Sequence, residues 1–126
     1  MSYDQHPADI QREFEANQAN GNVGSILVSE TDRLRVWHIV LPAGERLPVH
    51  KHVLNYFWTA LSVGKSRSHH MNGQVNEHEY SVGETKHFEY GPGEFMMHDL
   101  ENIGDTELRF VTVEMKDGEN EPLRVN

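Results

Sequence analysis

Two histidines separated by one residue, His50 and His52, have the spacing in this sequence that points most directly to chemistry. On a β-strand, residues two positions apart face the same side, so both imidazoles would point one way and Lys51 the other. Two nitrogen donors on one rigid strand form a preset pair of metal ligands. A pair of surface histidines is the simpler interpretation of this spacing, so the flanking residues must decide between the two.

The flanking residues extend the pattern. Gly44 stands six residues before His50, and the apolar run that follows His52 ends at Gly64. Further along the chain, a Gly-Pro-Gly loop precedes a third histidine, His98. The three histidines therefore fall into two separate blocks, each next to glycine-containing turns.

Together with Asn102, which stands four residues after His98, these blocks resemble the two sequence motifs of the cupin superfamily. The first motif is a glycine, five residues, His-X-His and an apolar strand that ends in glycine. The second is a loop with proline and glycine, a histidine, three residues and an asparagine, and the loop here is longer than usual. The resemblance spans about residues 34–114. It implies an all-β, single-domain cupin β-barrel, or double-stranded jelly roll, that binds a metal through His50, His52 and His98.

The sequence departs from the cupin pattern where a glutamate ligand usually follows the second histidine. The corresponding positions hold Tyr56 and Phe57, and strand alternation turns Tyr56 inward. We expect Tyr56 to be the catalytic residue, as a hydrogen-bond donor to bound water or substrate. A phenolate ligand is the less favoured alternative, because an unperturbed phenol has a pKa of about 10. Glu94, in the loop before His98, is a second candidate to replace the missing carboxylate.

The resemblance also suggests a function. His-X-His followed by tyrosine is similar to a small group of bacterial monocupins known as beta-alanine-degradation cupins or as uncharacterised cytoplasmic proteins. A three-histidine site without carboxylate resembles that of thiol dioxygenases. We therefore expect a metalloenzyme that acts on a small polar molecule, with a carboxylate-bearing substrate and dioxygenase chemistry as one option. Isomerase and hydrolase reactions stay open. The alternative is a non-catalytic cupin that binds or senses a small ligand.

The donor set limits the metal. Three neutral imidazoles at one end of a barrel would leave coordination positions open, as catalytic sites do. Nitrogen ligands suit Zn, Fe(II), Ni or Cu, whereas Mg and Ca require oxygen. The sequence contains no cysteine, so thiolate ligands are excluded. We expect one divalent transition metal, either Fe, Zn or Ni.

The other histidines have simpler interpretations. His69-His70 falls on an expected hairpin strand, and a half-exposed pair is favoured over a residue that faces the cavity. His38 alternates with valines, which predicts a core position. His78 and His87 are expected at the surface.

Several further side chains are candidates to face the cavity. Arg67 could bind a carboxylate substrate, but a solvated arginine is favoured. The residues expected to line the barrel are Trp58, Met71, Phe95, Met96 and Met97.

The surrounding elements must position these residues. From Val23 onward, short β-type runs alternate with turns such as Asn72-Gly73, which indicates an all-β barrel or jelly roll. Residues 34–41 have apolar side chains at both parities, which predicts a strand that is buried on both faces or that closes a barrel.

The two ends of the chain differ from this pattern. Residues from Pro7 to about Gln18 predict one short helix that packs Ile10 and Phe14 against the flank of the domain. We expect an N-terminal segment at 1–22, a cupin barrel at 23–116 and a C-terminal tail at 117–126. The tail is expected to be loose or to lie against a neighbouring subunit.

The composition of the chain limits the kinds of partner that the protein is expected to bind. Lys and Arg total 11 against 20 Asp and Glu, a net charge of −9, which disfavours nucleic acids and anionic membranes. No apolar run approaches the roughly 20 residues of a transmembrane helix, and the polar N-terminus is not a signal peptide, so a cytoplasmic location is expected. The open edges of a small barrel predict a homodimer. A small molecule is the expected ligand.

Overall fold

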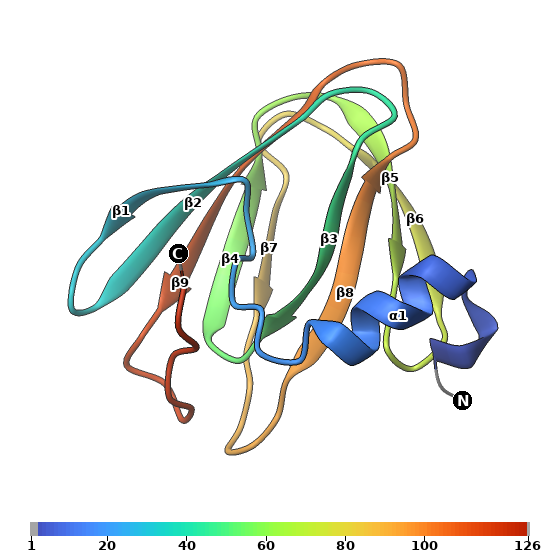
Figure 1. Cartoon of the computed structure of the whole chain (residues 1–126). Helices are drawn as coiled ribbons and strands as arrows, with labels where there is room; N and C mark the ends of the chain where they lie inside the picture. The colour runs from blue at the N-terminus through green and yellow to red at the C-terminus, as the bar shows by residue number, and fades with distance from the viewer. Residues whose placement is uncertain (1–2, 126) are drawn as a thin grey trace.

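The computed structural model describes residues 3–125 (Figure 1). Residues 1–2 of the expected N-terminal segment and residue 126 of the expected tail lie outside the described residues. The elements in chain order are η1 (Tyr3–Gln5), α1 (Ala8–Ala16), β1 (Ile26–Glu30), β2 (Leu34–Leu41), β3 (Arg46–His52), β4 (Asn55–Ala60), β5 (Gly64–His69), β6 (Val75–Tyr80), β7 (Thr85–Phe88), β8 (Met96–Asn102) and β9 (Leu108–Met115).

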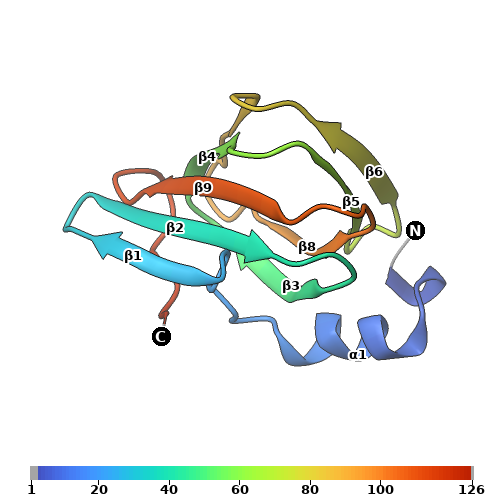
Figure 2. The same cartoon turned by 90° about the horizontal axis from the view of Figure 1, so that it is seen from above.

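The strands form two antiparallel sheets that face each other, as Figure 2 shows from above. One sheet has the order β1-β2-β9-β4-β7, and the other has the order β3-β8-β5-β6. Most neighbours in each sheet, such as β2 and β9 or β3 and β8, are distant in sequence, as in a jelly roll, so the all-β prediction is confirmed. The predicted hairpin at Asn72-Gly73 joins β5 to β6, and Gly73 supplies the turn with a φ of 94°.

Alternation along β2 sends Trp37, Ile39 and Leu41 into the interior. The opposite face is only partly covered, and His38 on that face is exposed. Of the two alternatives for this strand, burial on both faces was therefore wrong, and so was the core position predicted for His38. The physical reason is that α1 covers the other sheet, so the outer face of this sheet keeps contact with solvent.

The helix α1 lies against the outer face of the sheet that contains β3 and β8 (Figures 1 and 2). Ile10 and Phe14 are buried there against Val49 and Met97, so the predicted helix and its packing are confirmed. Met97 therefore belongs to the helix contact rather than to the barrel lining. Neither helical segment within 3–125 is long and apolar enough to cross a bilayer.

The C-terminal tail packs on its own chain. The Asn120 side chain accepts a hydrogen bond from Gly93 N at 2.8 Å, and its amide donates to Val53 O and Gly91 O at 3.0 Å each. These bonds hold the tail on the loop that leads into β8. The expectation of a loose tail was wrong for this part.

Candidate metal centre

The register of two neighbouring strands brings the three predicted ligands together. His50 and His52 lie on β3, and His50 is the Cα partner of His98 on β8. Ring nitrogens from all three residues lie within 4.8 Å of one another, so the group could hold a metal ion. The ring centroids are 4.8 Å apart for His50 and His98, 5.0 Å for His50 and His52, and 5.2 Å for His52 and His98.

Burial keeps these imidazoles neutral at physiological pH. It lowers the pKa of His50 to about 4, and it lowers the pKa values of His52 and His98 well below 6.5. The neighbouring His50 lowers the pKa values of His52 and His98 further. His50 Nδ1 lies 2.9 Å from Pro48 O, and because a carbonyl only accepts, the proton must sit on Nδ1. His50 Nε2 is then left with its lone pair, the form that binds metals.

Two ring nitrogens of the cluster have no partner in the protein. His52 Nδ1 and His98 Nδ1 are buried without a hydrogen bond to any residue that the structure describes. Buried polar atoms are normally paired, because leaving one unpaired costs free energy. Imidazoles with unsatisfied nitrogens fit a site that is completed by a group from outside the chain, such as a metal ion.

Tyr56 reaches the cluster from the opposite sheet. Its ring stacks on His52 with centroids 4.1 Å apart and on Phe88 at 4.6 Å. Burial raises the pKa of the Tyr56 phenol well above 10, and Tyr90 raises it further. Tyr56 therefore points inward, as predicted, and burial favours the neutral form of its phenol.

A cavity of about 460 Å³ adjoins the cluster. One of its walls is apolar and comes mainly from the sheet that contains β4 and β9, with Ile39, Trp58 and Phe110. The facing wall, from β5 and the turn after it, carries Ser68 and His70. The cavity therefore combines a flat apolar side with a polar side.

The pair His69-His70 is divided between the two faces of its sheet. His69 is buried on the outer side and donates from Nδ1 to Asp99 at 3.0 Å. His70 lines the cavity with its ring 5.1 Å from that of His98. The favoured expectation of a half-exposed pair was wrong for His69, and His70 follows the cavity-facing alternative. Strand alternation was the available signal, because adjacent residues on a strand must face opposite sides.

Glu94 does not replace the missing carboxylate ligand. It is exposed, and its carboxylate accepts the Gly91 N–H at 2.6 Å within its own loop. Within residues 3–125, the group of side chains that could hold a metal ion consists of the three histidines. Glu94 shapes the turn before β8, which corrects the second candidate from the sequence.

The remaining sequence predictions are confirmed in part. Arg67 forms a surface ion pair with Glu77 at 2.8 Å, as expected for a solvated arginine. His78 and His87 are exposed, as predicted. The cavity lining includes Trp58 and Met96, as predicted, whereas Phe95, Met71 and Met97 lie elsewhere.

Sequence reasoning missed two buried carboxylates. Asp99 is fully buried behind His98 and binds Arg46 and His69. Glu114 is buried inside the barrel and accepts a hydrogen bond from Trp37 Nε1 at 2.8 Å. Burial raises the pKa of Glu114 to about 7. Its alternation with Thr112 on β9 was a signal for an inward position, although an acidic residue there normally faces water.

No family model matches the chain, and no curated protein matches it. Solved structures do. A cupin domain from Bordetella pertussis is 23% identical, covers 74% of this chain and 94% of its own, and superposes with a TM-score of 0.64. A double-stranded β-helix protein from Klebsiella pneumoniae is 24% identical, with 82% and 80% coverage and a TM-score of 0.58.

A DMSP lyase from Ruegeria pomeroyi is 18% identical, with 74% of this chain and 43% of its own covered and a TM-score of 0.51. At these identities the comparisons show the fold, a double-stranded β-helix.

Proposed function

From the cupin fold of this chain, we propose that the protein binds one divalent transition metal through His50, His52 and His98. The metal is presented to a small carboxylate-bearing molecule in the adjoining cavity. The observation that carries this proposal is the cluster itself, three neutral imidazoles with ring nitrogens within 4.8 Å. Nitrogen donors favour Fe, Zn or Ni. Such a metal, when bound, supplies Lewis acidity or, as iron, redox chemistry.

Charge favours an anionic ligand. The cluster contains no carboxylate, so a divalent metal held by three neutral histidines keeps its full positive charge. Lys86 is the one lysine or arginine among the residues that line the cavity, and it adds positive charge at its exposed side. A carboxylate is the simplest small group whose negative charge would be attracted by both the metal and Lys86.

The protein's own side chains would bind and orient such a ligand. The neutral Tyr56 phenol can donate a hydrogen bond to a carboxylate oxygen, and Ser68 and Asn76 offer further polar contacts. Trp58 and Phe110 on the apolar wall exclude water, which strengthens these electrostatic contacts. A molecule with one anionic group and an apolar body fits a cavity that has one polar and one apolar wall.

Two forms of the function follow from the site. A DMSP lyase shares the fold, so the fold is compatible with catalysis. In an enzyme, dioxygenase chemistry with bound iron is the first reaction to test. The competing form is a non-catalytic binding protein. It is favoured by the state of Glu77, the one carboxylate that lines the cavity, because this residue is ion-paired with Arg67 and is not free as a general base.

Ligand titration tests the proposal. Trp58 lines the cavity and gives a fluorescence signal for occupancy. Small carboxylates should change this signal in the metal-loaded protein, and the matching neutral amides should not. The same carboxylates should bind much more weakly to metal-free protein. Equal binding with and without metal would contradict the proposed role of the metal. Oxygen consumption by the iron-loaded protein separates catalysis from binding.

A further inference from the structure

We propose that residues 6–20, here called the bracing segment, position the metal ligands by fixing the backbone of the strands that carry them. The inference rests on the proposed metal site. The bracing segment lies on the outer face of the sheet, whereas the ligand side chains project from the inner face. The two sides are connected through the strand backbone and through a partly buried chain of ion pairs that ends at the buried Asp99.

The first set of contacts fixes β3 on both sides of His50. β3 is an edge strand, so one row of its backbone groups has no strand partner. The bracing segment supplies the partners. Val49 N donates to Glu13 Oε1 at 3.0 Å, and Val49 O accepts from the side-chain amides of Asn17 and Asn20 at 3.0 Å each. Lys51 N donates to Asn20 O at 2.8 Å.

This support falls where the strand ladder is weakest. The pairing of β3 with β8 is irregular between Leu47 and His50, so the ladder does not hold the residues immediately before His50. Val49 lies in that interval, and its backbone N–H and C=O are the groups bound by the bracing segment. Side chains of α1 and of the loop after it therefore replace the backbone hydrogen bonds that a neighbouring strand would otherwise form.

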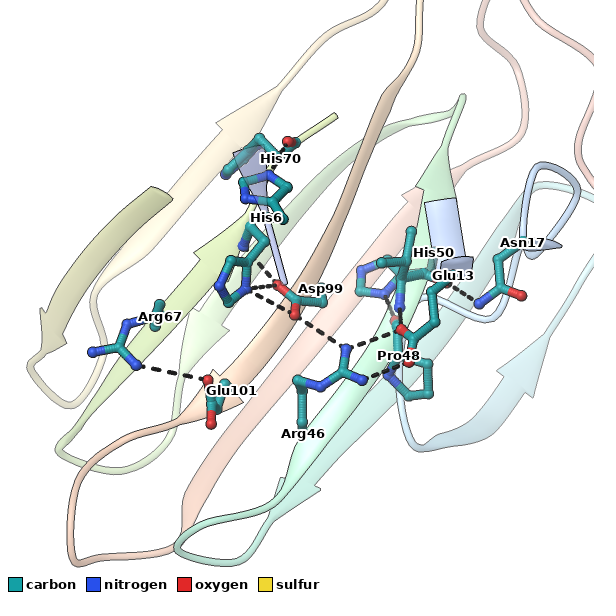
Figure 3. Close-up of polar contacts among 12 residues, drawn as sticks. His6, Glu13, Asn17, Arg46, Pro48, His50, Arg67, His70, Asp99 and Glu101 are labelled. Carbon is teal, nitrogen blue, oxygen red and sulfur yellow. Dashed lines mark hydrogen bonds and ion pairs between the residues drawn. The ribbon is translucent and has the colours of Figure 1, made fainter. Parts of the chain in front are cut away.

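The second set of contacts reaches β8. Arg46 lies between Glu13 of α1 and Asp99 of β8, with Nη1 at 2.9 Å from Glu13 Oε1 and 3.1 Å from Asp99 Oδ2 (Figure 3). Asp99 directly follows His98 and is fully buried. Its other oxygen accepts the backbone N–H of His69 at 2.6 Å. The charged chain thus ties the helix to the strand residue next to the third ligand.

The third contact fixes the cavity wall beside the cluster. His6 Nε2 donates to His70 O at 2.7 Å (Figure 3). His70 forms an isolated bridge with His98, so its backbone adjoins that of the third ligand. The His6 ring also stacks on Phe14 of α1, with centroids 5.8 Å apart. Both strands that carry the candidate ligands, and the cavity wall beside them, are therefore held by one short stretch of the chain.

A metal site binds more tightly when its ligands are fixed before the ion arrives. Supporting residues behind metal ligands typically contribute about 10–100-fold to metal affinity. Residues 6–20 are accordingly positioning residues, and their effect should appear in metal affinity and in the spectrum of the bound ion.

Cobalt binding provides the test, with Co²⁺ alone as the probe. The main variant combines Glu13→Ala with Asn17→Ala, and Glu13→Gln is the conservative variant because it keeps an oxygen for Val49 N. The matched control is Ser62→Ala. Ser62 also braces strand backbone, donating to Glu107 O and accepting from Arg109 N, but it lies in a turn away from the cluster. Affinity is measured by competition with a chromophoric chelator, alongside the visible spectrum of bound Co²⁺ and the melting temperature of metal-free protein.

The double variant should bind Co²⁺ about 10–100-fold more weakly than wild type, with an altered visible spectrum. Glu13→Gln should recover part of the affinity, and Ser62→Ala should bind within about twofold of wild type. If the double variant does not fold, the Co²⁺ affinity of the single variant Asn17→Ala tests the proposal instead. This variant removes one hydrogen bond and should still weaken Co²⁺ binding several-fold. Wild-type affinity in the folded variants, or an equal loss in Ser62→Ala, would overturn the positioning role. Wild-type protein that binds no Co²⁺ would instead overturn the metal site itself.

Discussion

His50 and His98 face each other directly across the β3–β8 ladder, as Cα partners with ring centroids 4.8 Å apart. Their separation is therefore set by backbone hydrogen bonding between two strands. His52, two residues further along β3, completes the group by strand alternation. A site built on this ladder should lose its metal without losing the barrel when one ligand is removed.

The variants His50→Ala and His52→Ala should each lose most of the bound metal and keep the fold. Each replacement removes one nitrogen donor, whereas the barrel depends on apolar residues such as Phe110. Elemental analysis gives the metal content, and circular dichroism reports the fold. His87→Ala, at an exposed position, is the control and should keep its metal. Global unfolding of both ligand variants would show that these histidines are structural core residues.

Tyr56→Phe should leave the metal content near normal and weaken ligand binding. The phenol is neutral and stacks on His52, so its proposed role is to donate a hydrogen bond to an anionic ligand. Loss of one bond to a charged group costs on the order of 1.5–3 kcal/mol. Calorimetry with a small carboxylate measures the change. A variant that loses its metal would identify Tyr56 as a ligand, and one that matches wild type in metal and ligand binding would place it in the packing shell.

Glu114 should make stability fall as the pH rises. Burial raises its pKa from 4.5 to about 7, so between these values the folded state holds a proton that the unfolded state has released. Deprotonation of the buried Glu114 therefore lowers the free energy of unfolding. This loss is absent below pH 4.5 and complete above pH 7, where it amounts to about 3 kcal/mol.

Glu114→Gln removes this titration and keeps an oxygen for Trp37 Nε1. The free energy of unfolding of metal-free variant, relative to wild type, should therefore increase from pH 5 to pH 8. Urea titrations at several pH values measure it. A difference that does not change with pH would show that Glu114 has an ordinary pKa.

Asn102→Ala should destabilise the fold while it leaves the ligands in place. The buried Asn102 amide donates to Leu41 O at 2.9 Å and to Thr106 O at 2.7 Å. Each buried group left unpaired costs about 1–3 kcal/mol. A lower urea midpoint with an unchanged metal content per folded chain is expected. A variant as stable as wild type would show that water replaces the amide without cost.

The His50–His52 pair and the inward tyrosine could be predicted because they depend on local geometry. His50, His52 and Tyr56 follow the two-residue period of a strand, and the barrel follows from many short strands. His98 required the motif resemblance, because its position opposite His50 is a matter of long-range register. The α1 helix was predictable from Pro7 and the spacing of its two apolar residues.

The remaining features depend on which face of each sheet is covered, and a sequence does not state this. His38 and His69 each lie on an outer face, yet His38 is exposed and His69 is buried. The difference is that the N-terminal segment covers only the sheet of His69. The partly buried ion-pair chain through Arg46 and Asp99 was missed because its partners lie far apart in sequence.

Metal stoichiometry of purified protein tests the central claim most directly. Elemental analysis by mass spectrometry, before and after loading with Fe, Zn or Ni, should give about one transition metal per 14.5 kDa chain. The amount should fall close to zero in His50→Ala. Protein that contains negligible metal, and that takes up none when each ion is supplied, would contradict the account.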